Sequence, residues 1–330
     1  MRAEDRFVER LREMLLPDDA ILLGPGDDAA VLRRAQSDGI ATTDMLVEGV
    51  DFFPGEDPER LGRRAVSVNL SDAAAMGARP RLFLLSIAVP AEREEDFALA
   101  VCRGAIARGR EHGAALAGGD LSRAPCVFVS VTLWGDLEGA PLTRSGALPG
   151  DLLFLSGATG RAAAGLRLAR EIVAETAFPG ARELLDAFHD PEPRVALGLA
   201  LSRRKLAHAA IDVSDGLGAD AARIASASAV RVVLERERVP ISASVAAAAR
   251  HFGVDPLPWV LSGGDDYEIL FAVPEEAAAS VEALPGDVSL TRVGRVERGS
   301  GAVLRGAAGD ADISALGYDH FERAPKAVKP

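Results

Sequence analysis

Short apolar runs rich in leucine, valine and isoleucine alternate along this chain with longer amphipathic runs. The short runs have the length and composition of buried β-strands, which predicts strands at Leu82–Val89, Val127–Leu133, Leu152–Phe154, Val230–Leu234 and Ile269–Val273. Helices are expected where apolar residues recur at helical spacing between capping residues, glycine or proline. The clearest are Ala91–His112, Val195–Leu206 and Ser242–Phe252. The alternation predicts an α/β (α+β) chain.

A break with strong turn chemistry, Leu148–Asp151, lies near the middle of the chain. A chain of 330 residues is long for one hydrophobic core and short for three. We therefore expect two domains, residues 1–148 and 149–330.

Two short sequence motifs recur in both halves of the chain, separated by a similar number of residues in each half. Val68–Asp72 resembles Ile211–Asp215, and Leu116–Asp120 resembles Leu261–Asp265. An internal duplication would produce this pattern, and so would chance recurrence of short Gly-Asp words.

Composition narrows the class of partner. The formal net charge of -12 argues against sequence-independent binding of nucleic acid, which requires clustered lysine and arginine. No apolar run approaches the roughly 18 residues of a membrane span. The segment Met1–Leu16 resembles an amphipathic helix rather than a signal peptide. With only Cys102 and Cys126 and no paired spacing, the sequence favours a reduced, cytoplasmic setting.

Several aspartates stand beside glycine, serine or threonine at the edges of apolar runs: Asp28, Asp44, Asp72, Asp120, Asp212 and Asp215. Each has a simpler interpretation when taken alone. The word Gly24–Ala30 is typical of a surface turn, and Thr42-Thr43-Asp44 could cap the next element. Asp72 ends a strand-like run and is expected to cap a helix of small residues, and Asp215 is interpreted in the same way. Gly118-Gly119-Asp120 is expected to form a turn.

Taken together, the aspartates predict a metal-dependent phosphotransferase. Buried carboxylates repel one another unless cations neutralise them. Magnesium bound by several carboxylates and by substrate phosphates is the usual arrangement in phosphoryl transfer. That reaction asks little of the protein beyond charge and position, so no general base or covalent nucleophile is expected.

Two further sequence motifs can each be interpreted in two ways. Arg144, within Leu142–Gly146, could grip a phosphate through its guanidinium or could be a solvated surface side chain. Gly157, Gly160 and Gly165 imitate a dinucleotide-binding loop but lack the acidic residue expected downstream, so we interpret them as a helix entrance.

Other enzyme classes lack their motifs. The five histidines show no His-Glu-x-x-His spacing, which disfavours a zinc hydrolase. A Gly-x-Ser-x-Gly word is absent, as are the His-Arg-Asp and Asp-Phe-Gly words of protein kinases.

Eight ordered blocks carry a family resemblance over nearly the whole chain. They are Gly26–Ala30, Thr42–Val50, Val68–Ala78, Gly118–Asp120, Thr143–Asp151, Ile211–Leu217, Ser262–Glu268 and Gly317–Phe321. In this order the chain resembles thiamine-monophosphate kinases, within the superfamily of aminoimidazole ribonucleotide synthetase and selenophosphate synthetase.

The resemblance implies two α/β domains, with the N-terminal domain pairing strands across a homodimer and the C-terminal domain closing over the nucleotide. It implies transfer of the ATP γ-phosphoryl group to thiamine monophosphate with several Mg²⁺ ions. By position, the residues that would hold magnesium are Asp28, Thr42, Thr43, Asp44, Asp72, Asp120, Asp212 and Asp215. Those that would contact ATP are Gly119, Asp120, Arg144 and Ser214.

Three positions depart from the family where it meets the thiamine portion. Asp51 replaces an expected histidine, Asp265 an expected glutamate, and Ala315 an expected aromatic residue. Two alternatives therefore stay open: a superfamily relative with another small-molecule acceptor, and a non-catalytic nucleotide- or metal-binding paralogue. Neither nucleic acid nor a membrane is an expected partner.

Overall fold

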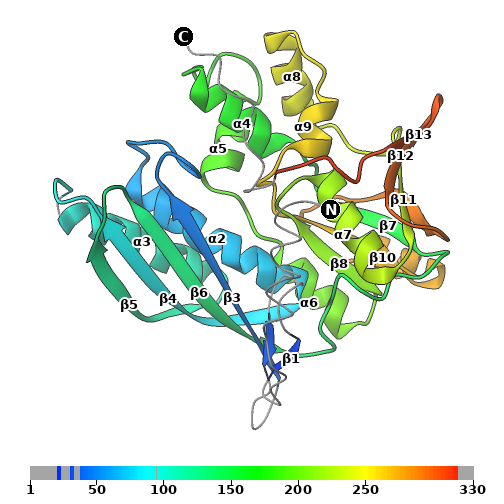
Figure 1. Cartoon of the computed structure of the whole chain (residues 1–330), viewed down its shortest axis with the longest axis horizontal. Helices are drawn as coiled ribbons and strands as arrows, with labels where there is room; N and C mark the ends of the chain where they lie inside the picture. Colours follow the sequence, from blue (N-terminus) through cyan, green and yellow to red (C-terminus); the bar gives the residue numbers. More distant parts are fainter. Residues whose placement is uncertain (1–20, 24–29, 33–37, 94, 319–330) are drawn as a thin grey trace.

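The computed structural model describes residues 21–23, 30–32, 38–93 and 95–318, and they form two sheets with helices packed between and outside them (Figure 1). The predicted helix at Met1–Leu16 lies outside these residues. Within the described chain, no helix combines the length and apolar character needed to cross a membrane.

The first sheet has six strands in the order β1-β2-β3-β6-β4-β5. Its strands are β1 (Ile21–Leu23), β2 (Ala30–Leu32), β3 (Gly39–Val47), β4 (Ala78–Val89), β5 (Ala115–Arg123) and β6 (Phe128–Leu137). All neighbours are antiparallel except β4 and β5, which are parallel.

Helices α2 (Pro58–Ala75) and α3 (Glu95–Glu111) cover one face of this sheet. Asp57 begins α2 by accepting two main-chain N–H groups of its first turn. The helices cross closely at Gly62 and Gly104, where an added Cβ would lie 2.0 Å and 1.9 Å from a carbonyl oxygen of the other helix. Among the described residues, no helix covers the opposite face of the sheet.

The second sheet has seven strands in the order β13-β12-β9-β11-β7-β10-β8, with only β9 and β12 parallel. Its strands are β7 (Leu152–Ser156), β8 (Ala209–Val213), β9 (Arg231–Glu235), β10 (Glu268–Val273), β11 (Leu290–Glu297), β12 (Ala302–Gly306) and β13 (Gly309–Asp312). The helices of this half are α4 (Arg161–Arg170), α5 (Ala181–His189), α6 (Val195–Arg203), α7 (Leu217–Ser228), α8 (Ala243–Phe252), α9 (Leu257–Ser262) and α10 (Ala278–Glu282), with a 3₁₀ turn at Glu275–Ala277.

The two sheets share the core that surrounds α2. One face of the second sheet, with Phe154 and Phe271 stacked at 5.8 Å between ring centroids, joins the core of the first sheet. Its other face packs with α4, α7 and α8 into a second core. Helix α2 contacts β3, β4 and β6 on one side and β8 and β10 on the other. Because α2 lies between the sheets, 13 of its 18 residues are buried.

The expected elements are confirmed in type, with small shifts at their ends. All five predicted strands form, as β4, β6, β7, β9 and β10, and the three predicted helices form as α3, α6 and α8. The glycine word after β7 is a helix entrance, with Gly160 at the N-cap of α4. The domain boundary at 148/149 stays a prediction, and the connection between the two sheets runs through residues 138–151.

Three local predictions are wrong. Asp72 does not cap a helix after a strand, because the whole run belongs to α2 and Asp72 lies near its C-terminal end. Asp215 is not the N-cap of α7, a position that Gly216 takes. Gly118–Asp120 is not a turn but part of β5. The repeated words of the two halves consequently adopt different structures.

Candidate active site

Helix α2 carries two neighbouring residues that bond to different sheets, Asp72 to the first and Ser71 to the second. Asp72 accepts a hydrogen bond from the Thr42 hydroxyl on β3, and Ser71 donates one to the Asp212 carboxylate on β8 over 2.7 Å. Ser71 is 0% and Asp212 2% exposed. Hydroxyl donors are neutral, so they orient these carboxylates without themselves adding a positive charge. We call Thr42, Asp44, Ser71, Asp72 and Asp212 the α2 seam.

Asp44 joins the seam through the geometry of its strand. It lies two residues after Thr42, so the alternation of side chains along β3 points both toward α2. Its main-chain carbonyl accepts a hydrogen bond from Ser130 at 3.0 Å. Burial raises the pKa of Tyr267 well above its usual range, and the negative charge of Asp44 is among the further causes. Asp44 therefore lies within electrostatic reach of the loop that precedes β10.

A second acidic group follows β8. Arg223 of α7 forms ion pairs with Asp215 and with Asp220. Burial raises the pKa of Asp220 to about 7, although the charge of Arg223 opposes this shift. The charge of Asp215 raises this pKa further, and that of Arg144 lowers it. Arg144 therefore lies within electrostatic reach of the loop after β8.

Two of the predicted acceptor residues meet at Arg64 of α2. Its guanidinium donates to the Asp51 main-chain carbonyl at 3.0 Å and to the Asp265 carboxylate at 2.8 Å. The Asp51 carboxylate accepts the main-chain N–H of Val47 at 2.8 Å. Positions 51 and 265, from different domains, are thus linked by one side chain.

Two other predicted residues, Ser214 and Ala315, lie in segments that main-chain hydrogen bonds hold beside the site. The Ser214 carbonyl accepts the N–H of Asp265 at 2.8 Å. Ala315 lies in an exposed turn after β13. Three residues later, the Tyr318 N–H donates to the Asp215 carbonyl at 3.0 Å. The segment with Ala315 therefore ends against the loop after β8.

Asp120 and Gly119 lie elsewhere, on the edge strand β5. The ladders align Asp120 with Ser86, then Ser130, then Met45 of β3. Three strand spacings of about 4.8 Å place Asp120 about 14 Å from β3. Within one chain, the structure does not bring Asp120 to the α2 seam.

Thr43 is also separated from the seam, because it follows Thr42 directly and points to the uncovered face. Its hydroxyl bonds the Thr132 hydroxyl and the Val131 carbonyl, each at 3.0 Å. Asp28, the remaining predicted ligand, lies outside the described residues.

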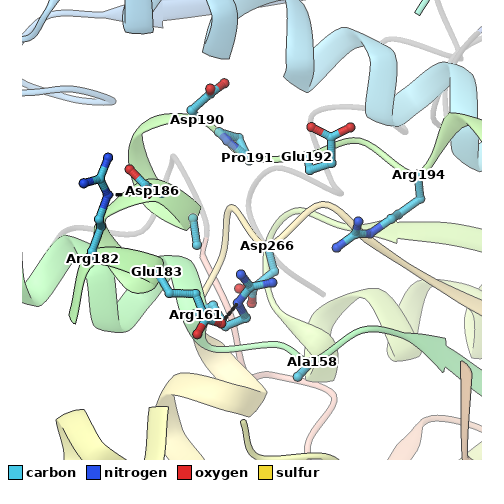
Figure 2. A pocket seen from close by; sticks show the side chains of 11 residues that line it. Ala158, Arg161, Arg182, Glu183, Asp186, Asp190, Pro191, Glu192, Arg194 and Asp266 are labelled. Carbon is cyan, nitrogen blue, oxygen red and sulfur yellow. Dashed lines mark ion pairs between the residues drawn. The ribbon is translucent and has the colours of Figure 1, made fainter. Parts of the chain in front are cut away.

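Two hollows flank these groups. A groove of about 980 Å³ runs between β5 and α3, with Gly119, Asp120 and Cys102 among its lining residues. A smaller pocket of about 410 Å³ lies among α5, the segment 190–194 and the start of α4 (Figure 2). Asp266 lines this pocket and accepts the main-chain N–H groups of Gly160 and Ala162.

Oxygen donors therefore gather at the α2 seam and in the loop after β8, in a form suited to a hard cation. In the part of the chain that the structure describes, no three carboxylate, imidazole or thiolate groups converge tightly enough to hold a metal alone. Magnesium keeps several water or phosphate oxygens in its shell, so hydroxyls and a few carboxylates are donors of the appropriate kind.

Sequence reasoning missed Arg64, Ser71, Asp220, Arg223 and Tyr267. A signal existed for Arg64, which shares helical spacing with the apolar residues Leu61 and Val68. The end of that run, Val68–Leu70, has the composition of a strand, and this conceals the helical spacing.

Comparison with known proteins matches both halves of the chain. Residues 26–137 match the N-terminal domain, and residues 149–306 the C-terminal domain, of AIR synthase related protein. Thiamine-monophosphate kinase of Rhodopirellula baltica is 36% identical over 89% of each chain. The same enzyme of Escherichia coli is 35% identical over 96% of each chain. A solved structure, AaThiL complexed with AMPPCP and TMP, is 30% identical, with a TM-score of 0.86 over 97% of this chain and 99% of that one.

Proposed function

The chain belongs to the thiamine-monophosphate kinase family of AIR synthase related proteins, and we propose that it transfers the γ-phosphoryl group of ATP to the phosphate of thiamine monophosphate. The products are thiamine diphosphate and ADP. The α2 seam carries the proposal, because it gathers hydroxyl and carboxylate oxygens from both domains around one buried helix. The relative solved with AMPPCP and TMP supports both substrates.

Magnesium is the proposed cofactor. The residues that would hold it are Asp28, Thr42, Thr43, Asp44, Asp72, Asp120, Asp212 and Asp215. Bound there, it supplies positive charge to the phosphates as negative charge shifts between them. The protein's part is to hold the donors in place: Thr42 orients Asp72, and Ser71 orients Asp212.

The nucleotide is proposed to contact Gly119, Asp120, Arg144 and Ser214. Arg144 supports this because its charge lowers the pKa of Asp220, whose carboxylate accepts the main-chain N–H of Asp215 in the loop after β8. A guanidinium can grip a phosphate through two parallel hydrogen bonds. The groove beside β5 supplies a hollow at Gly119 and Asp120.

Two copies are proposed to pair through the uncovered face and edge of the first sheet. Large apolar side chains there are solvent-exposed: Met45 by 55%, Leu84 by 36% and Leu121 by 62%. An edge strand such as β5 offers main-chain groups to another chain. Pairing would also bring the partner subunit's Asp120 toward a seam from which it is distant within one chain.

The acceptor is the least constrained part of the proposal. If Ala315 has lost a ring that stacks on thiamine, an exposed neighbour must replace it. Phe52 is 4% exposed and belongs to the core, and Phe53 is half-buried, with its ring centroid 6.1 Å from that of Phe188. Tyr318 is 48% exposed, and its main-chain N–H bonds Asp215. Tyr318 is therefore the strongest candidate. The departures at Asp51, Asp265 and Ala315 favour, as a second candidate function, phosphorylation of a different small molecule at the same site.

The proposed setting is the cytoplasm, which suits the unpaired thiols of Cys102 and Cys126. Substrates are the proposed partners, with no role for nucleic acid or a membrane.

A direct assay tests the function. Purified protein with ATP, magnesium and thiamine monophosphate should form thiamine diphosphate and ADP in equal amounts, and excess chelator should stop the reaction. A parallel panel of phosphorylated vitamins and nucleotides tests the second candidate. ADP formation with another acceptor, and none with thiamine monophosphate, would reject the assignment. Full activity in chelator would reject the metal mechanism.

A further inference from the structure

The three residues before β10 form an unusual turn. Asp265 and Tyr267 both have positive φ, 64° and 52°, a region that costs energy for residues other than glycine, and most for bulky ones. Such a backbone persists only where its surroundings hold it. The Asp265 and Tyr267 N–H groups donate to the carbonyls of Ser214 and Val213. The side chain of Asp266, between them, is held at the start of α4.

The Asp265 carboxylate is fixed from one side while its other side remains open. One oxygen accepts the Tyr267 hydroxyl at 2.8 Å, and the other accepts the Arg64 guanidinium at 2.8 Å. These bonds use about half of the acceptor positions of an ionised carboxylate. The side chain is still 39% exposed. An oriented, partly exposed carboxylate is suited to a cationic or N–H-donating ligand.

Arg64 is the part of this arrangement that comes from the other domain. Its side chain is 4% exposed, and its guanidinium lies 4.6 Å from the centre of the Phe188 ring. It also donates to the Asp51 carbonyl. One buried side chain thus connects the segment after β3, helix α5 and the turn before β10.

We propose that Arg64 is a positioning residue for the acceptor, acting through Asp265 on the cationic or amino-bearing part of the acceptor molecule. This inference rests on the proposed function, because thiamine monophosphate carries both a thiazolium cation and an amino group. Arg64 would hold the Asp265 carboxylate where that group binds and would couple the position of Asp51 to it.

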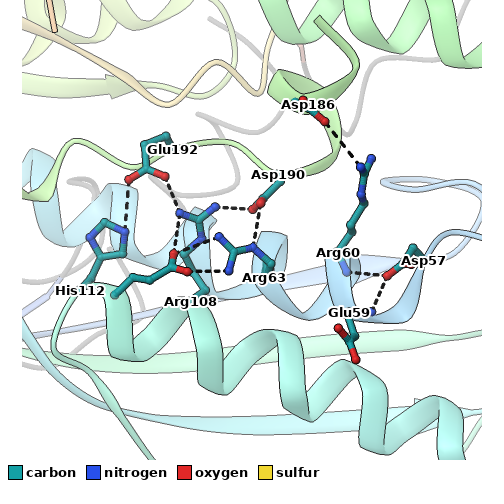
Figure 3. Close-up of polar contacts among 10 residues, drawn as sticks. Asp57, Glu59, Arg60, Arg63, Arg108, His112, Asp186, Asp190 and Glu192 are labelled. Atoms are coloured by element: carbon teal, nitrogen blue, oxygen red, sulfur yellow. Dashed lines mark hydrogen bonds and ion pairs between the residues drawn. The ribbon is translucent and has the colours of Figure 1, made fainter. Parts of the chain in front are cut away.

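The simplest competing explanation is that Arg64 only fastens the domains together. Arg63, the preceding residue of α2, is a matched control for that role (Figure 3). It bonds Glu111 at 2.8 and 3.0 Å and Asp190 of the C-terminal half at 2.7 Å. Arg63 therefore joins the same domains through a different ionic cluster.

Steady-state kinetics separate the two roles. Arg64→Gln should raise the KM for thiamine monophosphate about tenfold, with the KM for ATP changed less than about twofold. Arg64→Lys should recover part of the loss, because it keeps the charge but not the forked geometry. Tyr267→Phe, which removes only the second contact to Asp265, should raise the same KM by about threefold. It serves as the test if Arg64 variants fold poorly. Arg63→Gln should leave the acceptor KM within about twofold of wild type.

A double-mutant cycle tests whether Arg64 acts through Asp265. In an Asp265→Asn background, Arg64→Gln should add little to the acceptor KM, whereas independent roles would multiply. Multiplicative effects, or equal changes in both KM values for Arg63→Gln and Arg64→Gln, would overturn the inference and leave the proposed function standing. If the wild-type protein forms no thiamine diphosphate, the proposed function is overturned, and the acceptor assigned here with it.

Discussion

The two faces of the N-terminal sheet differ in what surrounds their polar residues. On the covered face, Thr42 and Asp44 point toward α2, and Thr42 donates to Asp72, the neighbour of Ser71, whose partner is Asp212. On the uncovered face, Thr43 forms a hydroxyl pair with Thr132. The covered face is a buried boundary between domains, whereas the other presents polar groups and exposed apolar side chains to solvent.

This difference shows that one sheet can place predicted metal ligands that are adjacent in sequence on two opposite faces. If residues on both faces take part in one reaction, those on the uncovered face and on β5 must act at the α2 seam of another chain. Pairing of two chains through that face is the simplest way to meet this requirement.

The largest expected effect is at the covered face. Asp72→Asn keeps the shape of the side chain and its contact with Thr42 but removes one negative charge. If Asp72 holds magnesium, kcat should fall by at least about a hundredfold, because a bound metal supplies several kcal/mol of charge stabilisation. The melting temperature should change little. Asp287→Asn, at an exposed position between α10 and β11, is the matched control. A variant with near-normal kcat would remove the seam from the reaction.

The next test asks which seam Asp120 serves. Asp72→Asn and Asp120→Asn should each be nearly inactive alone. If Asp120 acts in the partner's site, each mixed dimer contains one site with both changes and one with neither. A 1:1 mixture that exchanges subunits should then recover about one quarter of wild-type activity, because half of its dimers are mixed and each has one intact site. No recovery in mixtures shown by mass spectrometry to contain mixed dimers would assign Asp120 to its own chain.

The sequence predicts some of these elements and residues and not others, for physical reasons. Strands such as β4 and β10 were predictable because their apolar runs are short and bounded by turn residues. Helix α2 was not fully predictable because it is buried between two sheets, so its apolar residues cover nearly all sides and Val68–Leu70 imitates a strand. The sequence predicted Thr42, Thr43 and Asp44 as one set of ligands. In β3 the side chains alternate between the two faces, so Thr43 is separated from the other two. Arg64 depends on contacts with segments far away in sequence, and no local pattern predicts those.

A smaller effect is expected at Arg144, and it tests whether the ATP phosphates lie on the covered side. Arg144→Lys keeps the charge but loses the two-pronged geometry, so the KM for ATP should rise about fivefold or kcat should fall by a similar factor. The acceptor KM should stay near wild type. Arg170→Lys, on the exposed end of α4, is the control. Unchanged kinetics would return Arg144 to the role of a surface side chain and would weaken the placement of ATP at the loop after β8.

The last expected effect is on stability rather than on activity, and it concerns Asp266 in the C-terminal domain. Burial raises the pKa of Asp266 to about 7, although the N–H groups of Gly160 and Ala162 oppose the shift; the charge of Glu268 raises it further, and that of Arg161 lowers it. In the unfolded chain the carboxyl has the ordinary aspartate pKa of 3.8. Between these values the native state holds more protons than the unfolded state, so raising the pH lowers the free energy of unfolding.

Asp266→Asn has no proton to release and should remove this part of the pH dependence. Relative to wild type, the variant should gain on the order of 3–4 kcal/mol in unfolding free energy between pH 4 and pH 8, whatever constant cost the amide imposes. Asp220 titrates in the same window, but it is present in both proteins and cancels in the difference. Urea unfolding followed by the fluorescence of Trp259, which lies beside Gly160, measures the change, with Glu276→Gln on the exposed surface as control. Parallel pH profiles for wild type and Asp266→Asn would mean that the native state ionises Asp266 as readily as the unfolded chain does, and that the start of α4 stabilises the carboxylate more than burial penalises it.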